Sequence, residues 1–479
     1  MTLLILVNSH YNCSNLLFIR SIHMKKKFVI FVALVASLGG FLFGFDTAVI
    51  SGAEKSIQKL FVLSDWWHGF TVAAALIGTI IGALSAGKPA DRFGRKKVLI
   101  ITGVLYAVGA LGSALTSNWY VFMIFRFLGG LGVGASSVAA PMYIAESSPS
   151  NMRGRLVAFF QLNVVTGILV AFLSNYLLSG IGENAWRWML GIQALPATLF
   201  VSLVLFIPNS PRWLIKINQI KKAEDVFRKL GVENPQEEVK QVNSSILLEK
   251  KLGNEILLKK VYTFPILCAF LIAFFNQASG INAIMYYSPR IFEMTGISKD
   301  SALLQSVAIG LTNLIFTVLA IFIIDKFGRR LLMLIGSVGL ITFLTLIAIT
   351  FYTQNFNGYS IMFYLIGYIA FFAFSQGAVI WVFISEIFPT KVRAKGQTLG
   401  SFTHWLFAAL ISWLFPMVAE KGNTVEVLVD GRTTTFNAGS GHPFLFFAIM
   451  MFLQLILVWK YMPETKGKSL EELERMVTK

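Results

Sequence analysis

Two charged residues lie inside stretches that are otherwise apolar. Asp46 interrupts the apolar run of residues 28–50, and Arg126 interrupts the run of residues 119–141. An ionisable side chain at the centre of a membrane-spanning helix costs about 2.5–3.5 kcal/mol on insertion scales, so such residues usually pair or face a cavity. A buried carboxylate can change its protonation state when its partner moves. Asp46 and Arg126 are therefore predicted to form a pair that carries a proton; a static structural pair is the alternative.

Amide and aromatic side chains recur inside other apolar stretches of the chain. A neutral ligand rich in hydroxyl groups needs side chains that both donate and accept hydrogen bonds, and aromatic faces for its C–H surface. Any single amide could instead link two helices within the bilayer, but the concentration of amides at residues 276–282 favours a ligand site. There the segment ASGINA contains the helix-weakening Gly280, which predicts a break that turns side chains toward a cavity. The candidates are Phe43, Gln161, Asn276, Gln277, Asn282, Asn313, Gln376, Trp381 and Trp405.

The elements that carry these residues are predicted to be membrane-spanning helices. Hydrophobic residues make up 56% of the chain, charged residues make up 14%, and the mean hydropathy is +0.68. A soluble domain carries about 25% charged residues. The apolar residues fall into runs of about twenty, the length that crosses a bilayer as a helix. We predict an all-α polytopic protein with twelve spans near residues 28–50, 67–86, 98–115, 119–141, 156–178, 188–207, 261–287, 302–324, 331–352, 361–384, 396–418 and 444–462.

Charge and cysteine content exclude several other classes of protein. The formal net charge is +17, but the Lys and Arg residues stand in short loops between apolar runs. This placement favours a role in membrane orientation over nucleic-acid binding. Only Cys13 and Cys268 occur, so neither a disulfide framework nor a cysteine metal site is predicted. The chain contains no Walker-type phosphate-binding loop, and no cofactor is expected.

The spans group into two bundles of six helices on either side of one polar interval. Within that interval Trp213, Ile217, Ile220, Phe227 and Leu230 recur at helical spacing, which predicts short amphipathic helices; a disordered linker is the alternative. The distribution of positive loops places the interval and both termini on the cytoplasmic side of the plasma membrane. The predicted parts are a bundle over 24–207, a linker over 208–260, a bundle over 261–462 and a tail over 463–479.

The first residues of the chain stand apart from this arrangement. Residues 1–23 have a weak apolar start and lack a clean small-residue cleavage site, and Met24 opens a basic flank to the first span. We predict that residues 1–23 are a non-native or non-essential extension, with a cleaved signal peptide as the alternative.

Two charged motifs each occur twice. DRFGRKK begins at Asp91 and DKFGRR begins at Asp325, 234 positions later (325 − 91). AESSPSNMRGR aligns with SEIFPTKVRAK at an offset of 240 (386 − 146), which pairs Glu146 with Glu386. Two motifs at nearly one offset indicate a duplication whose halves insert with the same orientation and can rock against each other. We predict a cytoplasmic gate whose ion pairs, each worth about 0–1 kcal/mol, break on opening; simple basic anchors are the alternative. Its residues are Asp91, Arg95, Glu146, Arg153, Asp325, Arg329, Glu386 and Arg393.

The order of several motifs resembles a known family. GGFLFGFDTAVISG, DRFGRKK, RFLGGLGVG, PMYIAE, PNSPRWL, NQASGINAIMYYSP, DKFGRR, WVFISEIFP and PETKGKSLEELE look like the signature set of the sugar porter family of the major facilitator superfamily, over residues 25–477. The bacterial xylose and hexose proton symporters look most similar. The resemblance implies two pseudo-symmetric bundles with a site at mid-membrane depth. It also implies that Asp46, with Arg126, couples transport to protons.

The resemblance also implies a set of sugar contacts, with departures. Asn276 stands where relatives usually have Gln, Ile168 where the xylose symporter has Gln, and Gln376 where it has Trp, which leaves the particular sugar open. His404 replaces the Asn or Gln of the family and is predicted to contact sugar or to titrate. The positions that match the family's contacts are Gln161, Gln277, Asn282, Asn313, Gly377, Trp381 and Trp405.

Together these features predict proton-coupled symport of a monosaccharide by alternating access, with a monosaccharide, protons and the lipid bilayer as partners and no nucleic acid. Because no substrate bond is made or broken, the protein is not expected to be an enzyme. The alternatives are an uncoupled facilitator of a sugar or a polyol, a drug antiporter, and a transporter-like sugar receptor.

Overall fold

The structure, a computed structural model, describes the backbone of residues 2–149, 152–252, 255–356, 359–419, 424–429, 432–468 and 472–473; side chains are described from residue 27 onward, except in 250–252, 424–429 and 432–438. Twelve helical segments in these ranges are long and apolar enough to cross a membrane, which confirms the predicted number of spans. They are Lys27–Leu60, Asp65–Ser85, Arg95–Leu115, Trp119–Ser147, Arg153–Ile181, Ala185–Val204, Lys260–Glu293, Lys299–Phe327, Arg329–Thr353, Ser360–Ile387, Arg393–Ala419 and Gly439–Tyr461.

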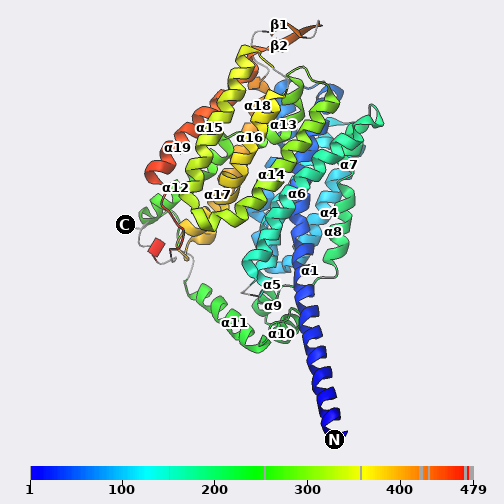
Figure 1. Cartoon of the computed structure of the whole chain (residues 1–479), viewed down its shortest axis with the longest axis vertical. Helices are drawn as coiled ribbons and strands as arrows, with labels where there is room; N and C mark the ends of the chain where they lie inside the picture. Colours follow the sequence, from blue (N-terminus) through cyan, green and yellow to red (C-terminus); the bar gives the residue numbers. More distant parts are fainter. Residues whose placement is uncertain are drawn as a thin grey trace.

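The spans form two halves that lie side by side (Figure 1). The N-terminal half consists of α1 (Thr2–Leu60), α2 (Asp65–Ser85), α3 (Gly87–Phe93), α4 (Arg95–Leu115), α5 (Trp119–Ser147), α6 (Arg153–Leu178), α7 (Ala185–Gly191) and α8 (Ala194–Val204). The C-terminal half consists of α12 (Thr263–Ala278), α13 (Ile281–Glu293), α14 (Lys299–Phe327), α15 (Arg329–Thr353), α16 (Ser360–Phe372), α17 (Ala378–Ile387), α18 (Arg393–Ala419) and α19 (His442–Tyr461).

The ends of the spans form two faces of the molecule, the basic face and the opposite face. The basic face carries the charged motifs, at residues 87–97, 146–149, 325–330 and 386–395. The opposite face carries the turn between α1 and α2 and the turn between α13 and α14, at residues 61–64 and 294–298. Because successive spans alternate in direction, the connection that follows each even-numbered span lies at the basic face.

The polar interval between the halves forms helices at the basic face. They are α9 (Pro211–Lys216), α10 (Ile220–Lys229) and α11 (Pro235–Leu252), which lie below the bundles in Figure 1. The Ser210 side chain accepts a hydrogen bond from the Trp213 backbone N–H and so caps α9. The Trp213 indole N–H donates to the Asp91 carbonyl at 3.0 Å, which docks α9 on α3. Phe227 and Leu230 are buried. The prediction of amphipathic helices is confirmed, and a disordered linker is wrong for these ranges.

Two features of the C-terminal half bear on the sequence expectations. Gly280 separates α12 from α13 with a φ of +85°, which confirms the predicted break. Strands β1 (Thr424–Val429) and β2 (Arg432–Asn437) pair in antiparallel fashion at the opposite face, with Thr424 facing Asn437. The all-α prediction omitted this hairpin, although a DG dipeptide between β-forming residues is its sequence signal.

The two halves meet closely near the opposite face. The rings of Trp66 in α2 and Trp413 in α18 lie 4.8 Å apart between centroids, and the Trp413 indole N–H donates to the Trp66 carbonyl at 3.1 Å. A Cβ on Gly69 would lie only 2.0 Å from the Trp413 carbonyl oxygen, so the backbones of α2 and α18 touch. The Ser179 hydroxyl donates to Asp300 at 3.2 Å across the same face.

Glu464 caps α15 at the basic face. Its carboxylate accepts the backbone N–H groups of Arg329 and Arg330, each at 3.0 Å, and that of Lys466 at 2.9 Å. These N–H groups belong to the positive end of the helix dipole or to the adjacent turn. Partial burial raises the pKa of Glu464, but the backbone N–H donors outweigh burial and hold that pKa below its ordinary value of 4.5.

The substitution Gly280→Ala should destabilise the protein. An L-residue at a φ of +85° is strained by about 1–3 kcal/mol, and the new Cβ would lie 2.3 Å from the Phe447 ring. We expect a lower midpoint of heat unfolding in detergent, measured by intrinsic fluorescence. Gly154→Ala is the matched control because Gly154 is helical and a Cβ there would meet nothing within 4 Å. Equal midpoints for the two variants would contradict the role given to Gly280.

The substitution Glu464→Gln should lower stability in a pH-dependent way. Because the pKa of Glu464 is lower in the folded state, its carboxylate stabilises the fold above pH 4.5, and this contribution is lost as pH falls through the lowered pKa. Unfolding midpoints of the two proteins should therefore differ at neutral pH and converge in acid. A difference that stays constant down to the acid limit of the titration would show that the charge of Glu464 is not responsible.

Candidate functional site

The buried ion pair predicted from the sequence is present. Asp46 of α1 and Arg126 of α5 lie 2.9 Å apart between Oδ1 and Nη1, and their exposed fractions are only 5% and 4%. The two charges cancel where water is excluded, which is the arrangement that makes a buried ion tolerable. Loss of either partner would leave an uncompensated buried charge.

Close helix packing sets the depth and direction of Asp46. A Cβ on Gly44 would lie 1.8 Å from the Val164 carbonyl oxygen, and a Cβ on Gly167 would lie 2.1 Å from the Phe41 carbonyl oxygen. A glycine on each helix therefore lets the backbones of α1 and α6 touch, as small residues permit within a bilayer. Phe43, almost one helical turn before Asp46, is left on a partly buried face of α1.

Three predicted amides meet at the break between α12 and α13. The Gln277 Nε2 donates to Asn276 Oδ1 at 3.0 Å, and Asn282 Nδ2 donates to Gln277 Oε1 at 3.0 Å. Asn276 and Gln277 are buried. Gly280 has a left-handed backbone conformation, which breaks the helix between Gln277 and Asn282. The side chains of these two residues nevertheless contact each other across the break. The amides hydrogen-bond to one another, so each can exchange a partner for a hydroxyl of a ligand.

His404 of α18 lies against these amides and between two tryptophans. The Gln277 Nε2 is 3.2 Å from His404 Nδ1 and 3.1 Å from His404 Nε2. A nitrogen nearly equidistant from both ring nitrogens cannot lie in the ring plane without overlapping the carbon between them, so the amide lies over the imidazole face. Ring centroids of Trp381 and Trp405 lie 4.8 and 4.9 Å from that of His404. Trp381 is 38% exposed.

One aromatic contact joins this cluster to the helix that carries Asp46. The rings of Phe43 in α1 and Trp405 in α18 lie 5.4 Å apart in an edge-on arrangement. Phe43 belongs to the N-terminal half and Trp405 to the C-terminal half. The contact therefore places the amide and aromatic cluster about one helical turn along α1 from the buried carboxylate.

The remaining predicted contacts are arranged differently. Gln161 is partly buried and Asn313 is 7% exposed, and the described residues offer no hydrogen-bond partner to either amide. Gln376 is fully buried and its Nε2 lies 3.0 Å from Met451 Sδ. Gln376 and Gly377 belong to a π-helical turn, Ala373–Gly377, which the sequence did not reveal. Such turns often occur at functional sites, but here the turn directs Gln376 toward α19.

The charged motifs form one cluster in each half. In the N-terminal half Arg95 Nη1 lies 3.1 Å from Asp91 Oδ1, and Arg95 Nη2 donates to Glu146 Oε1 at 2.9 Å. Each of these two ion pairs joins residues of a single half. In the C-terminal half Arg329 repeats the arrangement, with Asp325 at 3.0 Å and Glu386 at 3.1 Å.

The two outer arginines of the motifs do not join these clusters. Arg153 is exposed, and Arg393 donates to the Phe388 carbonyl and the Thr390 hydroxyl. Arg153 and Arg393 each stand at the first residue of a helix, α6 and α18, beyond the turn that follows the acidic residue. The two copies of the motif therefore align in sequence at Arg153 and Arg393, but among the described residues neither arginine pairs with the acidic residue of its motif.

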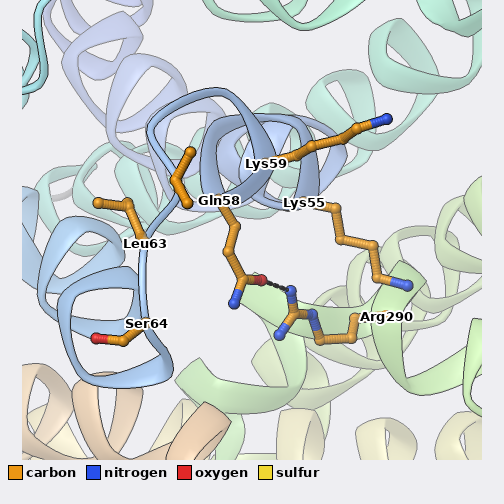
Figure 2. A pocket seen from close by; sticks show the side chains of 7 residues that line it. Lys55, Gln58, Lys59, Leu63, Ser64 and Arg290 are labelled. Atoms are coloured by element: carbon orange, nitrogen blue, oxygen red, sulfur yellow. Dashed lines mark hydrogen bonds between the residues drawn. The ribbon is translucent and has the colours of Figure 1, made fainter.

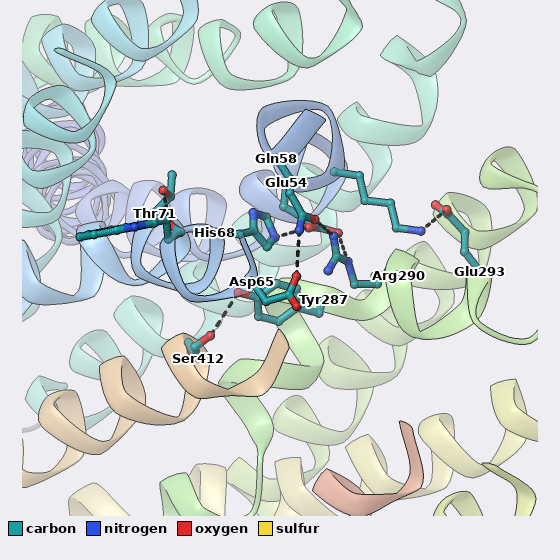
Figure 3. Close-up of polar contacts among 11 residues, drawn as sticks. Glu54, Gln58, Asp65, His68, Thr71, Tyr287, Arg290, Glu293 and Ser412 are labelled. Carbon is teal, nitrogen blue, oxygen red and sulfur yellow. Dashed lines mark hydrogen bonds and ion pairs between the residues drawn. The ribbon is translucent and has the colours of Figure 1, made fainter. Parts of the chain in front are cut away.

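A polar cluster at the opposite face was not predicted. Glu54 of α1, His68 of α2 and Arg290 of α13 are all buried there, and Figure 3 shows their side chains converging. A cavity of about 680 Å³ beside them is lined by Arg290, Lys55 and Gln58, among others (Figure 2). In the sequence, Glu54, His68 and Arg290 each stand in or beside an apolar run. A single ionisable residue at such a place looks like the ordinary polar end of a helix, so the sequence did not indicate that the three side chains meet.

Comparison with known proteins gives consistent matches over nearly the whole chain. The sequence profile described as sugar (and other) transporter matches residues 32–477. The D-xylose-proton symporter of Escherichia coli is 36% identical, covering 94% of this chain and 96% of that protein. The arabinose-proton symporter of Bacillus subtilis is 35% identical, covering 94% and 95% respectively. The glucose transport protein of Synechocystis is 35% identical, covering 93% and 97%.

Solved structures agree with this result. The inward open conformation of the xylose transporter XylE from Escherichia coli matches with a TM-score of 0.80 and 35% identity, covering 94% of this chain and 100% of that one. The same transporter bound to 6-bromo-6-deoxy-D-glucose matches with a TM-score of 0.76 and 36% identity, covering 94% and 99%. The fold, the order of its motifs and these matches establish that the chain belongs to the sugar porter family of the major facilitator superfamily.

Proposed function

We propose that the protein carries a monosaccharide together with protons across the plasma membrane by alternating access, with its basic face in the cytoplasm. The observation that carries this proposal is the buried Asp46–Arg126 pair, one helical turn from an aromatic contact to the amide cluster. The relatives named as proton symporters of xylose and arabinose support the coupling and the substrate class. The excess of Lys and Arg in the loops of the basic face supports the orientation.

Coupling follows from the charge balance of the pair. While Arg126 is 2.9 Å from Asp46, its guanidinium balances the charge of an ionised carboxylate. A movement of α5 away from α1 would leave a buried carboxylate without its cation, and protonation of Asp46 removes that cost. Because Phe43 and Asp46 lie on the same helix, a ligand that displaces Phe43 from Trp405 also acts on the pair.

The arrangement of contacts supports a conformation closed at the opposite face. Trp66 and Trp413 pack there, Ser179 binds Asp300, and Glu54 binds Arg290, so that each contact joins the two halves. The clusters of Arg95 and Arg329 at the basic face join residues within one half. We propose that these clusters keep the helix ends of each half rigid and that the basic face opens and closes between them. The likeness to an inward open relative supports this assignment.

The site favours a neutral polyhydroxylated ligand over an apolar drug. The amides of Asn276, Gln277 and Asn282 offer paired donors and acceptors, and Trp381 offers an exposed aromatic face for the C–H surface of a ring. We propose a pentose or hexose as the substrate. An uncoupled polyol facilitator would share the amides but would have no need of a buried carboxylate paired with Arg126.

The substitution Asp46→Asn should abolish accumulation of sugar against a gradient. In proteoliposomes an inward pH gradient of one unit supplies about 1.4 kcal/mol per proton and drives about tenfold accumulation at one proton per sugar. The variant keeps the size of the side chain but cannot exchange a proton, so we expect uptake only to equilibrium, with radiolabelled xylose and glucose as probes.

Asp225→Asn is the matched control for this experiment, because Asp225 is exposed and pairs with Arg228 on α10. Its accumulation should equal that of the wild type. Gradient-driven accumulation by Asp46→Asn at the level of Asp225→Asn would reject the proton-coupling role.

The substitution Gln277→Ala should weaken sugar binding. It removes the side chain that contacts Asn276, Asn282 and His404, and an unmade hydrogen bond to a buried polar group costs about 1–3 kcal/mol. We expect the half-saturating sugar concentration to rise by about ten- to a hundredfold. Asn163→Ala is the control, because the Asn163 amide binds Ser37 and the Phe159 carbonyl. If both variants changed the half-saturating concentration alike, the assignment of Gln277 would be wrong.

A further inference from the structure

The cluster at the opposite face contains an ion pair that crosses between the halves. The Arg290 Nε of α13 donates to Glu54 Oε1 of α1 at 3.0 Å. The other carboxylate oxygen, Oε2, lies 2.7 Å from Nε2 of His68 in α2. The exposed fractions of Glu54, His68 and Arg290 are 1%, 0% and 4%. Glu54 and His68 belong to the N-terminal half, so separation of the halves at this face removes Arg290 from Glu54.

Glu54 pairs with Arg290 in this cluster, so a neutral His68 adds no uncompensated charge to that pair. Lys55 of α1 pairs with Glu293 of α13, and Arg290 also donates to the Gln58 side chain. Gln58 in turn donates to Asp65 Oδ1 at 3.2 Å, in the first turn of α2, where the helix dipole favours an anion. The ring of Tyr287 lies 6.1 Å from that of His68. Figure 3 shows Gln58, Asp65 and Tyr287 near His68.

The hydrogen bonds indicate which tautomer of His68 this conformation favours. Since a carboxylate only accepts, His68 Nε2 must carry the proton that it donates to Glu54. The other ring nitrogen, Nδ1, is buried and has no hydrogen-bond partner among the described residues. A second proton on Nδ1 would create an unpaired buried donor and would leave the group of Glu54, Arg290 and His68 with a net positive charge. In the closed opposite face a neutral His68 therefore avoids an unpaired buried donor at Nδ1.

We propose that His68, paired with Glu54, is a second proton-binding site, which takes up one proton from water when the halves separate at the opposite face. The inference rests on the alternating access proposed above. Separation leaves the Glu54 carboxylate without Arg290. A proton added to His68 Nδ1 then restores charge balance as a Glu54–His68 ion pair, and water can accept the hydrogen bond of the new Nδ1–H. The site differs from Asp46, which pairs with Arg126 inside one half.

This site links the pH at the opposite face to the conformation. If opening takes up one proton, the ratio of open to closed protein rises by up to about tenfold for each unit of acidification. The linkage is reciprocal, so whatever opens that face also raises proton affinity at His68. The linkage should weaken once the pH is well below or well above the range in which histidine titrates.

The test measures opening directly, in a full-length Asp46→Asn background that removes the proposed carrier carboxylate. Cys13 and Cys268 are replaced, and spin labels are attached at Tyr120→Cys and Tyr359→Cys, which are exposed positions at the opposite-face ends of the two halves. Pulsed electron paramagnetic resonance then gives the distance distribution between about pH 8 and about pH 5. We expect the long-distance population to grow on acidification, by up to about tenfold in ratio per pH unit.

Substitution of His68 should remove this growth. His68→Gln keeps an amide donor for Glu54 but cannot gain charge, and Glu54→Gln removes the carboxylate that a charged His68 would need; both should give pH-independent distances. His442→Gln is the matched control, because His442 is an exposed histidine at the same face that binds the Tyr352 hydroxyl. It should retain the full response.

Two results would overturn the inference: a response that persists in either His68→Gln or Glu54→Gln, or an absent response in the parent. Proton-driven sugar uptake by the wild type is measured separately. If uptake occurs while the distance response does not depend on His68, only this inference fails. If uptake never responds to the proton gradient, the proposed coupling fails, whatever the distances show.

Discussion

The ion pair between Asp46 and Arg126 is stable only because both charges are buried together. At an exposed fraction of 5% or less, neither side chain has enough water to solvate it alone. The close contact of α1 with α6 near Gly44 and the position of α5 must therefore hold the two groups within hydrogen-bond distance. In the proposed mechanism, a helix movement that separates them is accompanied by protonation of Asp46, which links the conformation of the protein to proton uptake.

Charge pairing also determines where the molecule can separate. Arg95 binds Glu146, and Arg329 binds Glu386, so each of these pairs at the basic face joins residues of one half, and separating the halves there need not break them. At the opposite face Arg290 binds Glu54 across the boundary, so separation there must break a buried ion pair. The two ends of the molecule therefore open at different electrostatic cost. The duplicated motifs alone would not suggest this asymmetry, because they are the same in both halves.

The sequence was sufficient for features that depend on local patterns. Hydropathy predicted twelve spans, and the glycine in ASGINA predicted the break at Gly280. It was insufficient where the outcome depends on how distant helices are rotated. The cluster of Glu54, His68 and Arg290 joins three helices, and each residue alone looks like a polar helix end. Gln376, which was predicted to contact a ligand, lies with its amide nitrogen 3.0 Å from the sulfur atom of Met451 in α19, and no sequence pattern indicated the π-helical turn that positions it.

The amide cluster suggests how affinity and specificity divide in the proposed site. Asn276, Gln277 and Asn282 already bind one another, so a sugar hydroxyl replaces an existing hydrogen bond instead of satisfying an empty one. Each such exchange contributes only about 0.5–1.5 kcal/mol. A hydroxyl in the wrong position, however, leaves a buried amide unpaired and costs more than a correct one contributes. In the proposed site the amides would therefore discriminate between sugars, and the exposed part of Trp381, which would gain contact area with any ring, would supply much of the affinity.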